Sequence, residues 1–303
     1  MNELRHRAED YLATRRALGY KLHHHGRLLS SFVEFCEAAD ADYVSVDLAI
    51  HWATLPQEVQ PIWWSQRLGV IRGFARHLAT VDDRTEIPPT DALAARAPRT
   101  PPHLFSATEI AELMAEARRI RFPLKAATYE TLIGLLASSG LRVGEAIRLD
   151  DGDVDLASGL ITIRQTKFRK SRLIPLHPST CEALAVYARL RRELLDGRPI
   201  GSFFVSLVGT PLLHGAVNQT FRTLVQATGL EQPGRRRPRP HDLRHSFTIS
   251  VLLDWYRSGV DVAPRLAALS TYLGHHKPSS TYWYLQASPE LFALAAERLE
   301  TRR

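Results

Sequence analysis

The chain has 303 residues, of which 45% are hydrophobic and 23% charged, a globular balance with enough length for two separate cores. It carries 39 basic against 32 acidic residues, and the resulting formal charge of +7 favours a polyanionic partner. No apolar run approaches membrane-spanning length and the N-terminus lacks the apolar centre of a signal peptide, so we expect a cytoplasmic protein with no membrane partner.

Residues 1–85 are predicted to form a small helical domain, because apolar side chains recur there at helical spacing in four stretches. The fourth stretch, from Trp64 to Leu78, also carries three arginines that we expect to point away from the apolar stripe. These are Arg67, Arg72 and Arg76. They form either a solvated face or a face that contacts DNA.

Residues 86–105 are predicted to be an extended linker. Prolines crowd this segment and it shows little apolar periodicity. A hinge here would let two DNA-facing domains close around a duplex.

Residues 106–303 are predicted to form the second domain, which opens with the capping box Ser106–Glu109. A later helix ends at Gly140, and a new short helix begins directly after it, which places Arg142 near a helix N-terminus. Backbone donors there already favour an anion, and the guanidinium strengthens such a site. An isolated arginine in this position is more often structural, paired here with Glu145.

Two apolar runs, Leu160–Ile163 and Leu173–Leu176, flank a basic stretch and predict an antiparallel hairpin with a basic tip. The tip holds Lys167 and Lys170, two of only five lysines in the chain. A basic tip is usually just solvated. The alternative is an ammonium that lies close to a phosphate and protonates a departing oxygen as a general acid.

An arginine-rich loop is predicted before residue 241, because arginines alternating with prolines cannot form a stable helix. Its members are Arg235, Arg236, Arg237 and Arg239. We expect them to contact phosphates of a nucleic-acid backbone.

Residues that could handle a phosphodiester follow this loop. His241 and Arg244 lie one turn apart on a predicted helix, where a histidine beside a guanidinium fork suits phosphate oxygens. His275 adds a donor, and nine residues further on Tyr284 adds a hydroxyl that can act as a nucleophile once it is activated. Taken alone, the pair is usually a solvated helix face, and the aromatic run around Tyr282 is usually a core stripe.

The ordered series of motifs resembles the tyrosine recombinase (phage-type integrase) family. The motifs are Ser138–Ala146, the basic hairpin, His241–Arg244, Leu273–His275 and Thr281–Tyr284. The resemblance implies a mainly α fold, with a helical N-terminal core-binding domain and a mixed, mostly helical catalytic domain that contains a small antiparallel sheet. It also implies a site-specific DNA recombinase that works through a 3′-phosphotyrosyl intermediate and a Holliday junction. The longer connection before His275 resembles transposon-associated members.

The resemblance also assigns the catalytic residues. They are Arg142, Lys167, His241, Arg244, His275 and Tyr284. In this assignment Tyr284 attacks the phosphodiester, the arginines and histidines stabilise its oxygens, and Lys167 protonates the leaving oxygen, with Lys170 as the alternative. Neither ATP, a metal nor another cofactor is implied, and Cys36 and Cys181 show no metal-ligand spacing and are expected to be free thiols.

The implied partner is double-stranded DNA with inverted-repeat core sites, bound by a homotetramer in the nucleoid and assisted by accessory DNA-bending or directionality proteins. The terminal helix, residues 288–303, is expected to pack on a neighbouring protomer or, alternatively, within its own chain. Three other functions stay open: a type IB topoisomerase, a metal-dependent nuclease and a catalytically silent DNA-binding relative.

Overall fold

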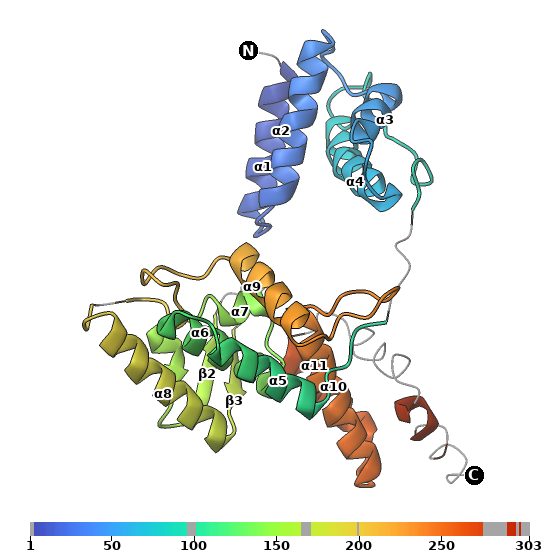
Figure 1. Ribbon diagram of the computed structural model, residues 1–303. Coiled ribbons are helices and arrows are strands. Elements are labelled where there is room, and N and C mark those ends of the chain that lie inside the picture. The colour runs from blue at the N-terminus through green and yellow to red at the C-terminus, as the bar shows by residue number, and fades with distance from the viewer. Residues whose placement is uncertain are drawn as a thin grey trace. The chain divides into compact units, whose positions relative to one another are not determined.

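The structure is a computed structural model that describes residues 3–95, 101–164, 171–198, 200–274, 290–294 and 297 (Figure 1). The chain divides into two compact units, Met1–Arg99 and Thr100–Arg303. Among the helices of the described residues, none combines the length and the apolar character needed to cross a membrane.

The first unit consists of two helical pairs. Its helices are α1 (Glu3–Ala17), α2 (His23–Ala38), α3 (Val46–Thr54) and α4 (Pro61–Leu78). Their apolar faces enclose one core, in which the rings of Phe32 and Trp52 meet edge to face with centroids 5.4 Å apart. Ser45 begins α3 as a true N-cap, because its hydroxyl accepts the Leu48 N–H at 3.2 Å.

Arg67 belongs to this core, and the prediction that it points away from the apolar stripe of α4 is wrong. Only 9% of the residue is exposed. Its guanidinium carbon lies 3.8 Å from the ring centroid of Trp52, and Nη2 donates to the Trp52 carbonyl at 2.7 Å. This carbonyl lies in the last turn of α3, where it also accepts the Leu55 N–H at 3.4 Å. Arg67 therefore joins α3 to α4 and is unsuited to contact DNA.

Arg72 is also engaged within the first unit. It is half-buried, and it donates to the carbonyls of Pro88 at 2.8 Å and Pro89 at 2.6 Å. These two hydrogen bonds attach the start of the proline-rich segment to α4. Of the three α4 arginines, Arg76 is the one with an exposed side chain.

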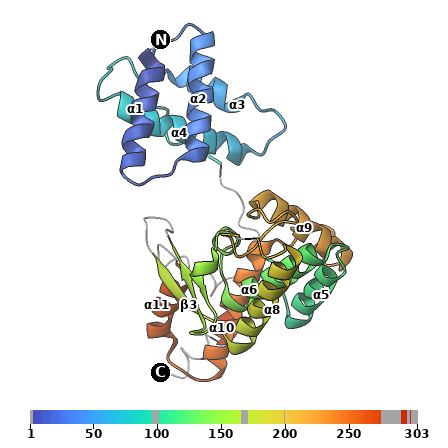
Figure 2. The ribbon, with the colours of Figure 1, turned by 90° about the vertical axis from the view of Figure 1, so that its left-hand side faces the viewer.

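The second unit places a small sheet among helices (Figures 1 and 2). Its helices are α5 (Ala107–Arg118), α6 (Pro123–Ser139), α7 (Val143–Ala146), η1 (Asp151–Asp153), α8 (Pro178–Leu194), α9 (His214–Ala227), α10 (Pro240–Arg257) and α11 (Val262–Leu273). Its strands are β1 (Val154–Asp155), β2 (Leu160–Ile163) and β3 (Arg172–Pro175). Helix α6 packs against α5, α8 and α10, while α11 lies beside β3. The predicted mainly α fold with a small antiparallel sheet is confirmed.

The sheet has the order β1-β2-β3 and is antiparallel throughout. Ile161 lies opposite Ile174 and both are buried, whereas Ile163 lies opposite Arg172 at the end of the hairpin where the connecting loop begins. The predicted hairpin is therefore present, with Ile161, Ile163 and Ile174 buried in the core and Leu173 exposed.

Gly140 fixes the turn that leads into α7. Its φ of +62° is in the left-handed region that favours glycine, and it ends α6 there. A Cβ on this residue would come within 2.4 Å of the Phe247 ring on α10. The glycine thus allows both the sharp turn and the close approach of α10, and it directs the chain toward Arg142.

A smaller core joins α10 and α11 and includes Leu291, which is fully buried. Residues 290–294 are helical, and Glu290 pairs with Arg257 of α10. This part of the predicted terminal helix packs within its own chain, although the adjacent Phe292 is exposed. Most of residues 288–303 lie outside the described residues.

Candidate active site

Three arginines from three different elements converge on the C-terminal end of α11. Arg142 is the N-cap of α7, Arg244 lies in the second turn of α10, and Arg172 begins β3. Each donates a hydrogen bond to a different carbonyl of the consecutive residues 272–274. The sequence identified Arg142 and Arg244 but missed Arg172.

Arg244 is the most deeply buried of the three, with 1% of the residue exposed. Its Nη1 donates to the Gly140 carbonyl at 2.8 Å and its Nη2 to the Leu273 carbonyl at 2.6 Å. It therefore connects the end of α6 to the end of α11. Helix C-termini carry partial negative charge, so both carbonyls suit a guanidinium.

Arg142 is the most accessible of the three, with 38% of its side chain exposed. Its Nη1 donates to Glu145 Oε1 at 2.8 Å and its Nη2 to the Gly274 carbonyl at 3.0 Å. Its backbone N–H donates to Glu145 Oε2 at 3.0 Å, which fixes the start of α7. Arg142 is both paired with Glu145 and open enough to meet a ligand, so the two readings of the sequence are compatible.

Glu145 is shared between Arg142 and Arg172. Arg172 donates to both carboxylate oxygens, from Nη1 to Oε1 at 3.1 Å and from Nη2 to Oε2 at 2.8 Å. Burial alone would raise the pKa of Glu145, but the bonds and charge of Arg172, with smaller contributions from Arg142, lower that pKa to about 2. Glu145 is therefore a carboxylate at any pH at which the protein would work.

We expect Glu145→Gln to lower the free energy of unfolding by about 3 kcal/mol at pH 7, because folding lowers the pKa of the wild-type Glu145 carboxyl and the glutamine has no such group. A group with a lowered pKa stabilises the fold above its unfolded pKa, and this stabilisation is lost as the pH falls through the folded value. For Glu145 the window runs from the ordinary value of 4.5 down to about 2. The difference between wild type and variant in urea unfolding should therefore shrink across this window.

The matched control is Glu116→Gln, because Glu116 pairs with the exposed Arg119 at the same three-residue spacing. An exposed pair of this kind contributes about 0–1 kcal/mol. A Glu145→Gln loss that stayed constant from pH 7 to pH 2 would mean that the carboxylate charge is not what holds Arg142 and Arg172.

His241 lies in the first turn of α10, where part of the residue is exposed. The protein packed around the ring lowers the pKa of His241 to about 4, and the charges of Arg244, Arg142 and Arg236 add to this effect. The imidazole is therefore neutral at pH 7, and one ring nitrogen can accept a proton or a hydrogen bond.

Asp242 sets the position of this first turn. Its buried carboxylate accepts the Arg239 N–H at 2.9 Å, as the N-terminal cap of α10. Burial raises the pKa of Asp242 to about 6. The sequence reading passed over Asp242, although an acidic residue in the first turn of a predicted helix is a recognised N-terminal signal.

The arginine-rich loop precedes α10 and is exposed, as its prolines predict. The exposed residues are Arg235, Arg236, Arg237 and Arg239. Two of them have acidic neighbours: Arg237 pairs with Glu231, and the Arg239 guanidinium lies 3.7 Å from the Asp242 carboxylate. Their contact with phosphates stays a prediction.

Four predicted site residues lie outside the described residues: Lys167, Lys170, His275 and Tyr284. The positions of the residues that flank these segments in the sequence are described. Strands β2 and β3 flank residues 165–170, and Gly274, in a left-handed conformation with φ +64°, directly precedes His275.

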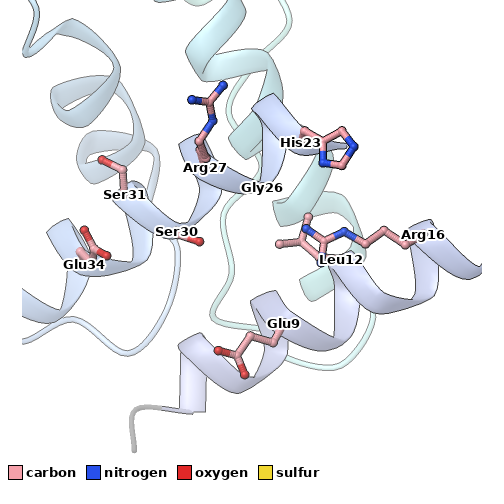
Figure 3. A pocket seen from close by; sticks show the side chains of 9 residues that line it. All are labelled: Glu9, Leu12, Arg16, His23, Gly26, Arg27, Ser30, Ser31 and Glu34. Atoms are coloured by element: carbon pink, nitrogen blue, oxygen red, sulfur yellow. The ribbon is translucent and has the colours of Figure 1, made fainter. Parts of the chain in front are cut away.

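A recess in the first unit, between α1 and α2, has a different character (Figure 3). Arg16 and Glu9 of α1 line it together with His23, Arg27 and Glu34 of α2. Charges of both signs line it, so it has no evident preference for an anion. It contains none of the predicted catalytic residues.

Among the described residues, no cluster of three or more histidine, cysteine, aspartate or glutamate side chains is arranged to hold a metal ion. Cys36 and Cys181 are both free thiols; Cys36 is buried and Cys181 is half-buried.

Comparison with known proteins adds sequence and fold relatives. The family model described as "Phage integrase family" matches residues 104–290. The putative integrase/recombinase y4rB of Sinorhizobium fredii (strain NBRC 101917 / NGR234) is 41% identical over 309 residues, which cover 100% of this chain and 98% of that protein.

Two solved structures share the fold. The Tn1549 transposon integrase in complex with transposon right end DNA has a TM-score of 0.65 at 17% identity, with 97% of this chain and 98% of that chain covered. The XerH site-specific recombinase bound to palindromic difH substrate, in a post-cleavage complex, has a TM-score of 0.64 at 18% identity, with 91% and 79% covered.

Proposed function

Because the chain belongs to the phage integrase family of tyrosine recombinases, we propose that it cuts and rejoins DNA at specific sites through a covalent 3′-phosphotyrosyl intermediate. One observation carries the proposal. Arg142 and Arg244, distant in the sequence, bond to the neighbouring carbonyls of Gly274 and Leu273, immediately before the segment that contains His275 and Tyr284. Such convergence of guanidiniums suits the two non-bridging oxygens of a phosphodiester.

In the proposed reaction the Tyr284 hydroxyl oxygen attacks the phosphorus, and the bond between phosphorus and the 5′ oxygen breaks. Arg142, Arg244 and His275 stabilise the charge that develops on the non-bridging oxygens. Since the phosphodiester energy is kept in the tyrosyl link, rejoining to a 5′ hydroxyl of the partner strand needs no ATP. Two such exchanges pass through a Holliday junction.

Proton transfer completes the step. The neutral His241 accepts the proton of Tyr284, and a bound phosphodiester assists because its negative charge raises the low pKa of the imidazole. Lys167 protonates the departing 5′ oxygen, with Lys170 as the alternative.

The proposed partner is a DNA duplex with inverted-repeat core sites, bound by four protomers and aided by accessory DNA-bending or directionality proteins. The DNA-bound structures of the Tn1549 integrase and XerH support a DNA partner by analogy. In this chain the exposed candidates for backbone contact are Arg76 in the first unit and the arginine-rich loop before α10. Lys170 is a further candidate from the sequence.

The test is covalent capture of DNA. The chain is incubated in EDTA with synthetic duplexes that carry a randomised core, the mixture is denatured in SDS, and DNA that stays linked to protein is sequenced. We expect linked strands that end in a 3′ phosphate, because a chemistry of arginine and lysine cations requires no divalent ion. The mass of the complexes, measured by native mass spectrometry before denaturation, should correspond to four protomers and two duplexes.

Each other outcome identifies a different activity. Cleavage that is lost in EDTA and restored by magnesium indicates a metal-dependent nuclease. Covalent complexes of one protomer that relax supercoils without joining two duplexes indicate a type IB topoisomerase. Binding without any linked DNA indicates a catalytically silent relative.

A further inference from the structure

The end of α11 holds the three site arginines in one arrangement. The carbonyls of Tyr272, Leu273 and Gly274 each accept a hydrogen bond from a different guanidinium: from Arg172 at 2.8 Å, Arg244 at 2.6 Å and Arg142 at 3.0 Å. The proposed reaction gives roles to Arg142 and Arg244. It leaves Arg172 without one, although each of its three nitrogens donates a hydrogen bond.

We propose that Arg172 is a positioning residue for strand cleavage, which holds Arg142 in place through their shared partner Glu145; this inference rests on the proposed recombinase function. Only 12% of the Arg172 side chain is exposed, compared with 38% for Arg142. Each of the three Arg172 nitrogens donates to Glu145 or to the Tyr272 carbonyl, so the role we assign to Arg172 acts through these neighbours.

The shared carboxylate provides the connection. Glu145 Oε1 accepts from Arg142 Nη1 at 2.8 Å and from Arg172 Nη1 at 3.1 Å. Arg172 also bonds the other oxygen, so the plane of the carboxylate is fixed from two points. Without Arg172 the carboxylate keeps only its bonds from Arg142 itself, to Nη1 and to the backbone N–H, and it loses the partner that holds both of its oxygens from another element of the fold.

Gly274 shows how tightly the two arginines are packed. A Cβ on this residue would lie 2.9 Å from Arg172 Nη1, 3.1 Å from its guanidinium carbon and 3.5 Å from Arg142 Nη1. Both guanidiniums therefore lie against the residue that directly precedes His275. A displacement of Arg172 is transmitted to Arg142 and to the start of the segment that carries the proposed nucleophile.

The test compares Arg172→Met with Arg191→Met. Arg191 is a matched control because it is similarly buried and bonds two carbonyls, Ser202 at 2.9 Å and Phe203 at 2.6 Å, and the carboxylate of Asp151 at 2.8 Å, away from the candidate site. Both variants should lose similar stability. Single-turnover cleavage of the duplex captured by wild type should fall about 10²-fold in Arg172→Met, because misplaced catalytic groups lose about that much. Arg191→Met should cleave at the wild-type rate, and DNA affinity should be unchanged in both.

A double-mutant cycle separates positioning from general structural damage. If Arg172 acts through Arg142, then Arg172→Met should cost much less in an Arg142→Met background than in wild type. Arg172→Lys should remain well below the wild-type rate, since a lysine restores the charge but cannot form the two parallel hydrogen bonds to the Glu145 carboxylate. Additive losses, or full recovery with lysine, would overturn the proposal.

A second readout does not depend on activity. The Nε–H resonance of the Arg142 side chain, assigned by its loss in Arg142→Met, should shift or broaden in Arg172→Met and stay unchanged in Arg191→Met. An unchanged Arg142 resonance in Arg172→Met would overturn the positioning role even if the chain cleaved no DNA. Absence of a covalent complex with wild type would, by contrast, contradict the proposed function itself.

Discussion

Tyr284→Phe is expected to abolish the covalent complex between protein and DNA while leaving non-covalent binding almost unchanged. The substitution removes only the phenolic oxygen, so the aromatic ring still fills its space and contacts with the DNA backbone stay available. No other group in the proposed site can replace a nucleophile in the 3′-phosphotyrosyl step. The measurement is SDS-resistant complex formation with the captured duplex, compared with binding in a gel-shift assay.

The matched control is Tyr282→Phe, which should still form the complex. At helical spacing, residues 282 and 284 point about 200° apart, so both cannot face one phosphate. The spacing from His275 in the family pattern selects Tyr284. Mass spectrometry of the DNA-linked peptide decides between them: an adduct on Tyr282 would overturn the assignment, and the absence of an adduct on either would contradict the mechanism.

The sequence predicted those elements whose signals are local. The capping box at Ser106 is present with both of its bonds, from the Glu109 N–H to Ser106 Oγ at 3.1 Å and from the Ser106 N–H to Glu109 Oε2 at 2.7 Å. Gly140 ends α6 in the left-handed conformation that its position predicts. Such signals depend on a few neighbouring residues, so a single sequence reveals them.

The arginines show where sequence reading fails. The sequence predicts that Arg67 points away from the apolar stripe of α4, but its guanidinium lies over the Trp52 ring and its Nη2 bonds the Trp52 carbonyl. Arg172 was overlooked because its partners, Glu145 and Tyr272, are distant in the sequence. One signal was available, since a charged residue at the start of a largely apolar strand needs a partner when it is buried.

Lys167→Ala is expected to slow cleavage of ordinary DNA by about 10²- to 10⁴-fold, the usual contribution of general acid catalysis. The departing 5′ alkoxide is a strong base that leaves readily only with a proton. The described ends of the hairpin favour this role. Ile163 pairs with Arg172, and Arg172 bonds Glu145, the partner of Arg142, so the loop that carries Lys167 begins and ends beside the proposed phosphate site.

A substrate with sulfur in place of the bridging 5′ oxygen isolates the proton transfer. A thiol has a pKa of about 8.5, so the sulfur leaves as a thiolate without protonation. Lys167→Ala should therefore cleave this duplex at close to the wild-type rate, and Lys170→Ala should cleave both duplexes nearly normally. Arg172→Met provides the contrast, because a misplaced Arg142 slows both substrates alike. An equal loss on both duplexes for Lys167→Ala would assign Lys167 a purely electrostatic role and would leave Lys170 as the proton donor to test.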